Sequence, residues 1–301
     1  MIDNSEIFLP ATEVIPPPLT KQIAHCIECA RRHVVKIIQH KKIGGEKKGL
    51  GPGILQSLHR EVLDYYPGWA GKFRVSDDVR VGDRKPVLTK DLEDHVYKFE
   101  TWLEEEIKNL EKPENHEDLY GALRVASAAH YAVVGDLHPF DDGNGRVARV
   151  LMNGILMLNT NEGRFYNYYI FPVPLLRETI KEEEIQKILD SGKEPKMSLY
   201  LKALTEVNNT WTLNPFEVYI AGKWIESINQ FLGSLEHYYK KSPKDKHWKS
   251  YLNIAATKYV DKLMERRSRL TSFIEDNRKG KYPIDKVPDF YASKYIVPEK
   301  S

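Results

Sequence analysis

A dense group of polar side chains stands between two apolar stretches of the chain, in the order His138-Pro139-Phe140-Asp141-Asp142-Gly143-Asn144-Gly145-Arg146. The run Gly143, Asn144 and Gly145 can take backbone conformations that are closed to most residues. Such a turn, opening directly into a helix, directs successive N–H groups at one point and adds the positive end of the helix dipole. This turn is therefore predicted to bind an anion such as a phosphate.

Two arginines follow the turn. Arg146 and Arg149 are three residues apart, so they lie on nearly the same face of the expected helix. Each guanidinium can bind a phosphate through two parallel hydrogen bonds. The opposite face carries apolar residues that would anchor the helix in the core, namely Val147, Val150, Leu151 and Leu158. One face of this helix is predicted to bind phosphates and the other to pack.

His138 and Asp142 supply the remaining chemical groups. A neutral imidazole can take a proton from an attacking hydroxyl, a contribution typically worth ~100- to 10,000-fold in rate. Asp142 offers a hard oxygen ligand beside the phosphate site, which suits Mg²⁺ bound jointly by a carboxylate and substrate phosphates. Pro139 is expected to stiffen the backbone after the base, and Phe140 to fill the core beneath it. Any one of these residues alone would fit a solvated capping turn, but the density of the set argues against that reading.

The elements that must position this loop are expected to be helices, because apolar residues recur at helical spacing along most of the chain. The predicted helices cover residues 20–40, a stretch containing Ile54 to Val62, 89–110, 117–134, the stretch after the loop through Leu158, 177–190, 196–209, 215–240 and 248–277. The sequence therefore predicts a mainly helical protein.

Three segments depart from this pattern. Between Phe73 and Val81 apolar and polar residues alternate, which predicts a short hairpin with its turn near residues 76–78. Residues 165–174 are aromatic and strand-like. The segment Gly44–Gly53 is rich in Gly and Lys but lacks the Gly-Lys-Ser/Thr ending of a P-loop, so it is interpreted as a linker.

Composition excludes some classes of function. The 301 residues include 45 Lys+Arg and 43 Asp+Glu, a formal net charge of +2 that provides no general attraction to nucleic acid or an anionic membrane. No apolar run approaches the ~20 residues that span a bilayer. Residues 1–18 lack the basic-then-apolar order of a signal peptide, so the expected compartment is the cytoplasm.

The cysteines of the chain, Cys26 and Cys29, form a single CxxC pair in a helix-like stretch. Without a second CxxC, the favoured interpretation is two small, half-buried thiols in a reducing compartment. His25 and His33 lie close enough in sequence to keep a metal site open as the alternative.

Residues 138–149, HPFDDGNGRVAR, match the signature His-Pro-Phe-x-Asp/Glu-Gly-Asn-Gly-Arg-x-x-Arg of Fic domains at every specified position. Leu58–Glu61 and Trp69–Arg74 resemble the entry into the flap of that family. Leu151–Asn153 resembles the usual continuation of the helix after the loop. The chain is thus similar to the protein adenylyltransferase type of the Fic/Doc family over roughly residues 50–175.

This resemblance implies an all-α bundle with a small β-hairpin flap over the active site and helical extensions at both ends. The flap would comprise residues 73–87 and would hold a target segment by strand addition. The expected domains are an N-terminal helical extension with its Gly/Lys-rich loop at 1–49, a Fic catalytic core at 50–175, and a C-terminal helical region with a flexible tail at 176–301.

The resemblance also implies an activity, the transfer of AMP from ATP to a Ser, Thr or Tyr hydroxyl of a target protein. His138 would be the general base, and Asp142 would hold Mg²⁺. Residues 143–145 would bind the α- and β-phosphates, Arg146 the β/γ-phosphates and Arg149 the terminal phosphate. The hydroxyl would attack the α-phosphate in line and pyrophosphate would leave, with positioning and charge stabilisation providing most of the catalysis.

Many members of this family carry an inhibitory helix, Ser/Thr-x-x-x-Glu-Gly/Asn, whose glutamate pairs with the second arginine. Residues Thr271–Glu275 fit the first part of this pattern, but Asp276 stands in place of Gly or Asn. Glu275 is therefore the candidate inhibitory residue, and an exposed glutamate on a charged helix is the alternative. On the N-terminal side, Glu28 lacks the Ser or Thr, because that position is Ala24.

Two other functions stay open at this point. The same loop could transfer another group, such as UMP, phosphocholine or phosphate, although the intact signature favours AMP. Alternatively, the chain could be a non-catalytic regulator that binds a peptide or a nucleotide. The expected partners are ATP and a target protein, with no membrane and no clear nucleic acid, and the sequence leaves a homodimer open.

Overall fold

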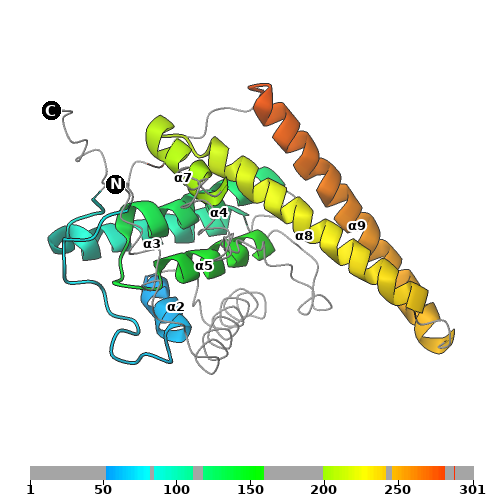
Figure 1. Cartoon of the computed structure of the whole chain (residues 1–301), viewed down its shortest axis with the longest axis horizontal. Helices are drawn as coiled ribbons and strands as arrows, with labels where there is room; N and C mark the ends of the chain where they lie inside the picture. The colour runs from blue at the N-terminus through cyan, green and yellow to red at the C-terminus, as the bar shows by residue number, and fades with distance from the viewer. Residues whose placement is uncertain are drawn as a thin grey trace, which may run out of the picture. The chain divides into compact units, whose positions relative to one another are not determined.

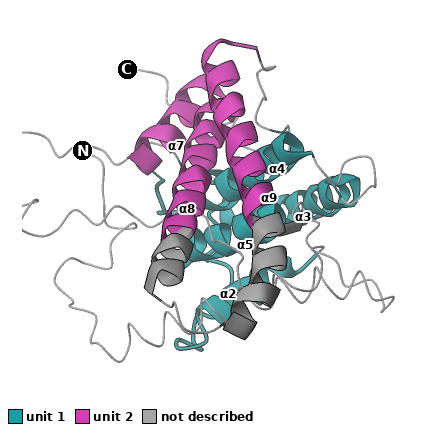
Figure 2. Cartoon of the chain, turned by 90° about the vertical axis from the view of Figure 1, so that its right-hand side faces the viewer, with its two compact units in different colours: residues 1–163, 287–301 teal, residues 164–286 magenta. Residues whose placement is uncertain are grey.

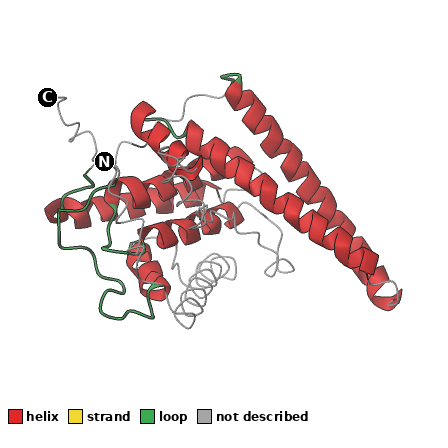
Figure 3. Cartoon of the chain, viewed as in Figure 1, coloured by secondary structure: helices red, strands yellow, loops and turns green. Residues whose placement is uncertain are grey.

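The computed structural model describes residues 52–81, 85–110, 118–158, 199–241, 246–281 and 288. The chain divides into two compact units, residues 1–163 with 287–301 and residues 164–286 (Figure 2). The described residues are mainly helical, as predicted, and Figure 3 draws no β-strand among them. The helices expected at 20–40 and 177–190, the strand-like segment at 165–174, both cysteines and nearly all of the Gly/Lys-rich segment lie outside the described residues.

The first unit contains helices on both sides of the polar loop (Figure 1). They are α2 (Ile54–Val62), α3 (Thr89–Leu110), α4 (Leu119–Tyr131), the π-helical turn η3 (Ala132–Leu137) and α5 (Asn144–Leu158). Helix α5 packs against α4, α2 and η3, while α3 packs against α4. These contacts place the N-terminus of α5, where the loop ends, among the other helices of the unit.

Helix α4 forms the centre of this core. It begins at Asp118, whose side chain accepts a hydrogen bond of 2.9 Å from the N–H of Gly121, a standard N-cap. Small residues such as Ala122, Ala126 and Ala129 are fully buried along it. Helix α5 buries the apolar residues Val147, Val150 and Leu151, as the sequence predicts.

A buried carboxylate fixes the start of α2. Glu100 lies in α3 and is 3% exposed. Its side chain accepts hydrogen bonds from the N–H groups of Gly53 at 2.6 Å and Leu55 at 2.9 Å. Burial raises the pKa of Glu100, although these backbone hydrogen bonds oppose that rise. Helix α3 thereby anchors the N-terminus of α2, the helix that carries His59 towards the polar loop.

The predicted β-hairpin at 73–87 is not confirmed. Residues 72–80 and 85–88 have no regular secondary structure, and residues 82–84 lie outside the described part. Hydrogen bonds from side chains hold this segment instead. Asp78 N–H, for example, donates to the Ser76 hydroxyl at 3.1 Å.

The second unit contains α7 (Leu199–Thr210), α8 (Asn214–Lys241) and α9 (Lys246–Arg278), close to the helices predicted at 196–209, 215–240 and 248–277. Helix α8 packs against α7 and against α9. Arg266 of α9 stacks over the ring of Trp224 in α8, with its guanidinium carbon 5.5 Å from the ring centroid. None of the helices in the described ranges is sufficiently long and apolar to cross a bilayer.

Candidate active site

The polar loop begins where a π-helical turn ends. Residues Ala132–Leu137 form this turn, and His138 follows with φ 39° and ψ 58°, the left-handed conformation. π-helical turns are rare and often mark functional sites. A non-glycine residue in the left-handed region costs on the order of 1–3 kcal/mol, so the surrounding structure must hold it there.

One hydrogen bond settles which ring nitrogen of His138 is basic. Its Nδ1 lies 3.0 Å from the carbonyl oxygen of Val134. A carbonyl can only accept, so Nδ1 carries the proton and Nε2 keeps a lone pair. Burial lowers the pKa of His138 from 6.5 to about 4; the bond to Val134 opposes this shift and the charge of Arg74 adds to it. At neutral pH the imidazole is therefore neutral and can accept a proton at Nε2.

The side chain of Asn144 closes the loop on itself. Its Oδ1 accepts a hydrogen bond of 3.0 Å from the N–H of Phe140, and its Nδ2 donates one of 2.7 Å to the carbonyl of the same residue. Asn144 is 4% exposed and Phe140 is fully buried. The amide oxygen and one amide hydrogen are thus engaged within the loop, while the main-chain N–H of Asn144 lies at the predicted phosphate site.

The N-terminus of α5 has a backbone geometry that suits the predicted anion site. Gly143 has φ 83°, and its carbonyl accepts from the N–H of Arg146 at 3.0 Å and of Val147 at 2.9 Å. The N–H groups of Asn144 and Gly145 precede these bonds, in the part of a helix where N–H groups have no intrahelical acceptor. They are available in geometry and charge for a phosphate.

Arg146 is held from two sides. Its Nη2 donates to the carboxylate of Asp142, and its Nη1 donates to the hydroxyl of Tyr65. The guanidinium carbon also lies 5.8 Å from the centroid of the Tyr65 ring. Tyr65 was not predicted as a site residue, because it is 81 residues away in sequence and no spacing connects it with the loop.

The predicted role of Asp142 as a ligand of Mg²⁺ stays a prediction, and the contacts of its carboxylate are compatible with it. Its Oδ1 accepts from the N–H of Gly143 at 2.6 Å and its Oδ2 from Arg146. The side chain is 41% exposed, and a carboxylate has about four lone-pair positions, so further positions stay open. Among the described residues there is no group of three or more His, Cys, Asp or Glu that could hold an ion. Asp142 would therefore share the ion with substrate phosphates, which is the usual arrangement for Mg²⁺.

The side chain of Arg149 lies over the first turn of α5. A Cβ added to Gly145 would stand 3.3 Å from one of its guanidinium nitrogens, so the glycine leaves room for Arg149 beside the anion site. The two arginines are on adjacent turns, as predicted. His130 of α4 is fully buried nearby. Burial, and then the charge of Arg149, lower the pKa of His130 from 6.5 to about 3.

His59 of α2 supports the loop from outside. Its Nδ1 accepts a hydrogen bond of 2.9 Å from the N–H of Gly71, so its Nε2 carries the proton and donates to the carbonyl of Asp142 at 2.9 Å. A Cβ on Gly143 would lie 3.2 Å from this imidazole, so only glycine fits there without displacing the ring. The stretch Leu58–Glu61 resembles a segment of Fic domains, but nothing in the spacing of its residues predicts a role for His59.

Glu275 lies in α9, in the second unit, and its side chain is exposed. Its carbonyl accepts a hydrogen bond of 3.2 Å from the N–H of Lys279 near the end of the helix. The inhibitory role of Glu275 towards Arg149 stays a prediction.

A family model and several curated proteins match part of this chain, and the residues matched by the family model include the site. Residues 50–156 match the model of the Fic/DOC family. A protein adenylyltransferase Fic of Nematostella vectensis is 40% identical over 101 residues, which are 33% of this chain and 21% of that protein. The protein of the same name from Drosophila mojavensis is 42% identical over 101 residues, 33% of this chain and 18% of that protein.

A solved structure, Fic-1 (residues 134–508) from C. elegans, superposes with a TM-score of 0.44 and 22% identity, covering 78% of this chain and 56% of that one. The chain spans about a fifth of the length of the curated relatives it matches.

Proposed function

This chain carries a domain of the Fic/DOC family, and from that premise we propose that it transfers AMP from ATP to a Ser, Thr or Tyr hydroxyl of a target protein. The observation that supports this most directly is the pairing of a neutral His138, with a basic Nε2, and an anion site at the N-terminus of α5. A base and a phosphate site on one short loop are the parts that nucleotide transfer to a hydroxyl needs.

In the proposed reaction the hydroxyl oxygen of the target attacks the α-phosphorus of ATP. The bond from that phosphorus to the bridging oxygen of the β-phosphate breaks, and pyrophosphate leaves. The proton of the hydroxyl passes to Nε2 of His138. Because Nδ1 of the same ring donates to Val134, the imidazole keeps its orientation, and the bond to a carbonyl also stabilises the positive charge that the ring acquires.

The phosphates would lie on the main-chain N–H groups of residues 144 and 145, with Arg146 and Arg149 supplying positive charge. Asp142 would hold Mg²⁺, which neutralises charge on the phosphates when bound. The contacts of Arg146 with Asp142 and Tyr65 restrict its guanidinium before the nucleotide arrives. That restriction lowers the entropy cost of binding.

The test is transfer of label from α-labelled ATP, with Mg²⁺, to the protein itself and to proteins of a cell lysate. We expect a mass increase of one adenylyl group on a Ser, Thr or Tyr residue. His138→Ala should lower the rate ~100-fold or more, and the matched control His95→Ala, in α3 of the same unit, should not. Transfer that survives His138→Ala would refute the assignment of the base.

The two other functions are outcomes of the same experiment. Label from UTP, from a phosphocholine donor or from γ-labelled ATP, in place of α-labelled ATP, would indicate that the loop transfers a different group. If no donor gives transfer by the wild-type protein while ATP still binds, the domain is a nucleotide-binding regulator and the proposed activity is wrong.

A further inference from the structure

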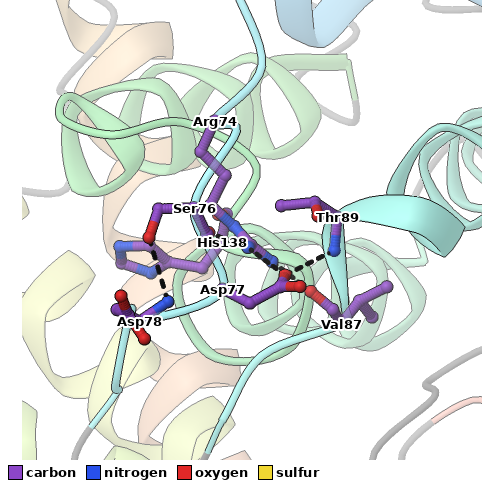
Figure 4. Close-up of polar contacts among 7 residues, drawn as sticks. All are labelled: Arg74, Ser76, Asp77, Asp78, Val87, Thr89 and His138. Carbon is purple, nitrogen blue, oxygen red and sulfur yellow. Dashed lines mark hydrogen bonds and ion pairs between the residues drawn. The ribbon is translucent and has the colours of Figure 1, made fainter.

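A buried guanidinium lies directly beneath the candidate base. The side chain of Arg74 is 1% exposed. Its Nε donates to the carbonyl of His138 at 2.8 Å, its Nη1 to the carbonyl of Ser76 at 2.8 Å, and its Nη2 to the carbonyl of Val87 (Figure 4). One side chain therefore connects the backbone of the base with both ends of the segment between residues 75 and 88.

The main chain repeats this connection. The N–H of Arg74 donates to the carbonyl of Pro139 at 2.9 Å, and the N–H of Val87 donates to the carbonyl of Asp136 at 3.0 Å. The two ends of the segment are thus hydrogen-bonded to Asp136, two residues before His138, and to Pro139, the residue after it.

Asp77 joins the same network and links it to α3. Its Oδ1 accepts the N–H of Thr89, the first residue of α3, at 2.6 Å and lies 3.4 Å from Nη1 of Arg74 (Figure 4). The two ends of the segment from 75 to 88 are therefore held by the same two side chains. The guanidinium of Arg74 bonds Ser76 and Val87, and the carboxylate of Asp77 bonds the N–H of Thr89. Its outer residues are exposed, with Val75 at 89%.

We propose that Arg74 is a positioning residue that holds His138 in its left-handed conformation by tying its carbonyl, through one guanidinium, to the main chain at Ser76 and Val87. The proposal rests on the function proposed above. His138 has φ 39°, a conformation that costs free energy unless its neighbours maintain it. The bond from Arg74 to its carbonyl is the contact that ties this peptide to the segment.

Arginine suits this position better than lysine does. The planar guanidinium carries five donors in a fixed fork, and here it reaches carbonyls of three different residues. An ammonium at the end of a flexible chain can approach one or two of these oxygens but cannot hold all three in one geometry. Removing the side chain would leave all three carbonyls without this donor, including the buried carbonyl of Val87.

The phosphate site does not depend on these contacts. Arg146 is held by Asp142 and Tyr65, and the start of α5 by the carbonyl of Gly143. Loss of Arg74 should therefore lower turnover while ATP affinity is kept. A role that is merely structural would lower both together.

The first experiment does not need the activity. Amide hydrogen exchange is followed in the wild type, Arg74→Gln, Arg74→Lys and the control Arg124→Gln, which removes an exposed arginine of α4. In Arg74→Gln we expect exchange at least ~10-fold faster in peptides that cover residues 74–88 and 136–140. Exchange in peptides from α3 and α4 should be unchanged. Unchanged exchange in both peptides would overturn the proposal, whatever the activity of the protein.

The second experiment measures transfer of label from α-labelled ATP to the protein itself, together with the affinity for ATP. We expect Arg74→Gln to lower the rate of transfer by ~100-fold, as a small misplacement of a base does, with ATP affinity changed less than about 3-fold. Arg74→Lys should recover part of the rate. If the glutamine variant does not fold, the lysine variant decides between the same outcomes.

Equal losses of ATP affinity and rate, or a lysine variant that matches the wild type, would refute the role of the guanidinium. A wild type that transfers no label refutes the proposed function instead, and the exchange experiment then decides the role of Arg74 alone.

Discussion

The imidazole of His59 lies flat against the ring of Phe140, with centroids 3.7 Å apart and planes inclined by 3°. The same imidazole bonds the carbonyl of Asp142 and the N–H of Gly71 through its two nitrogens. A histidine of α2 thus supports the loop between η3 and α5 by stacking and by hydrogen bonding at once. Its own position follows from α2, which Glu100 of α3 caps.

Substitutions of His59 should distinguish the contribution of stacking on Phe140 from that of the two hydrogen bonds. His59→Phe keeps the stacking on Phe140 but leaves the Gly71 N–H and the Asp142 carbonyl without partners. Each such group costs about 1–3 kcal/mol when buried, so we expect a loss of about 2–4 kcal/mol in unfolding free energy, measured with urea. His59→Asn places an oxygen near the Nδ1 position and should keep the bond from Gly71 only.

The matched control for His59 is Gln56→Ala. Gln56 lies in the same helix and donates to the carbonyl of Gly71 at 3.2 Å rather than to a residue of the loop. We expect this variant to lower stability by about 1 kcal/mol and to leave the transfer rate unchanged, while both His59 variants lower that rate. Equal rates in all three variants would show that support from α2 is unimportant for catalysis.

The hydroxyl oxygen of Tyr65 should increase the affinity for ATP by orienting Arg146. Tyr65→Phe removes the hydroxyl that accepts from Arg146 and keeps the ring near the guanidinium. The hydrogen bond involves a charged donor, so its loss should weaken ATP binding by roughly 3- to 10-fold, measured by titration calorimetry. The control is Tyr66→Phe, because the neighbouring tyrosine is 52% exposed. If both variants bind ATP alike, Tyr65 does not orient Arg146.

Most residues of the candidate site could be proposed from the sequence because they are contiguous. His138, Asp142 and Arg146 follow one another within nine residues, and their chemistry is evident from their types and spacing. The bounds of α3, Thr89–Leu110, could also be predicted, since its buried residues recur at helical spacing. Periodicity and local chemistry were enough for these features.

The supports of the site could not be predicted in the same way. Tyr65, Arg74 and His59 contact the loop across 81, 64 and 83 residues, and no local pattern encodes such pairings. The π-helical turn was missed because Ala132–Leu137 continues the apolar pattern of α4. The sequence assigns Asn144 to phosphate binding because it lies in the Gly-rich turn. In the structure its side chain is hydrogen-bonded to the main chain of Phe140, a contact that the sequence pattern does not indicate.

Asn144 should behave as a structural residue of the loop. Asn144→Ala removes the partners of both main-chain groups of Phe140, and we expect a loss of about 2–4 kcal/mol in unfolding free energy. Asn144→Asp keeps an acceptor for the Phe140 N–H but directs a second oxygen at its carbonyl, so it should be no more stable than the alanine variant. Stability equal to the wild type in both variants would mean that the amide is free to serve phosphate instead.

The buried histidines should make the first unit sensitive to acid. Burial lowers the pKa values of His59 and His138 from 6.5 to about 4 and that of His130 to about 3. Below pH 6.5 the unfolded chain therefore binds more protons than the folded one, so stability falls as pH falls. The loss from His59 and His138 levels off below about pH 4 and that from His130 below about pH 3. The raised pKa of Glu100 has the opposite effect on the pH dependence of stability, but it is one group against three histidines.

We expect each buried histidine to contribute a loss of about 1–2 kcal/mol between pH 7 and pH 5. Hydrogen exchange in peptides from α4 and α5 measures this in the first unit, without assuming that the two units unfold together. In His59→Asn one of the three groups is absent, so the protection of these peptides should fall less steeply with pH than in the wild type. The same slope in both proteins would contradict a neutral, buried His59, and greater stability at pH 5 than at pH 7 would show that Glu100 outweighs the histidines.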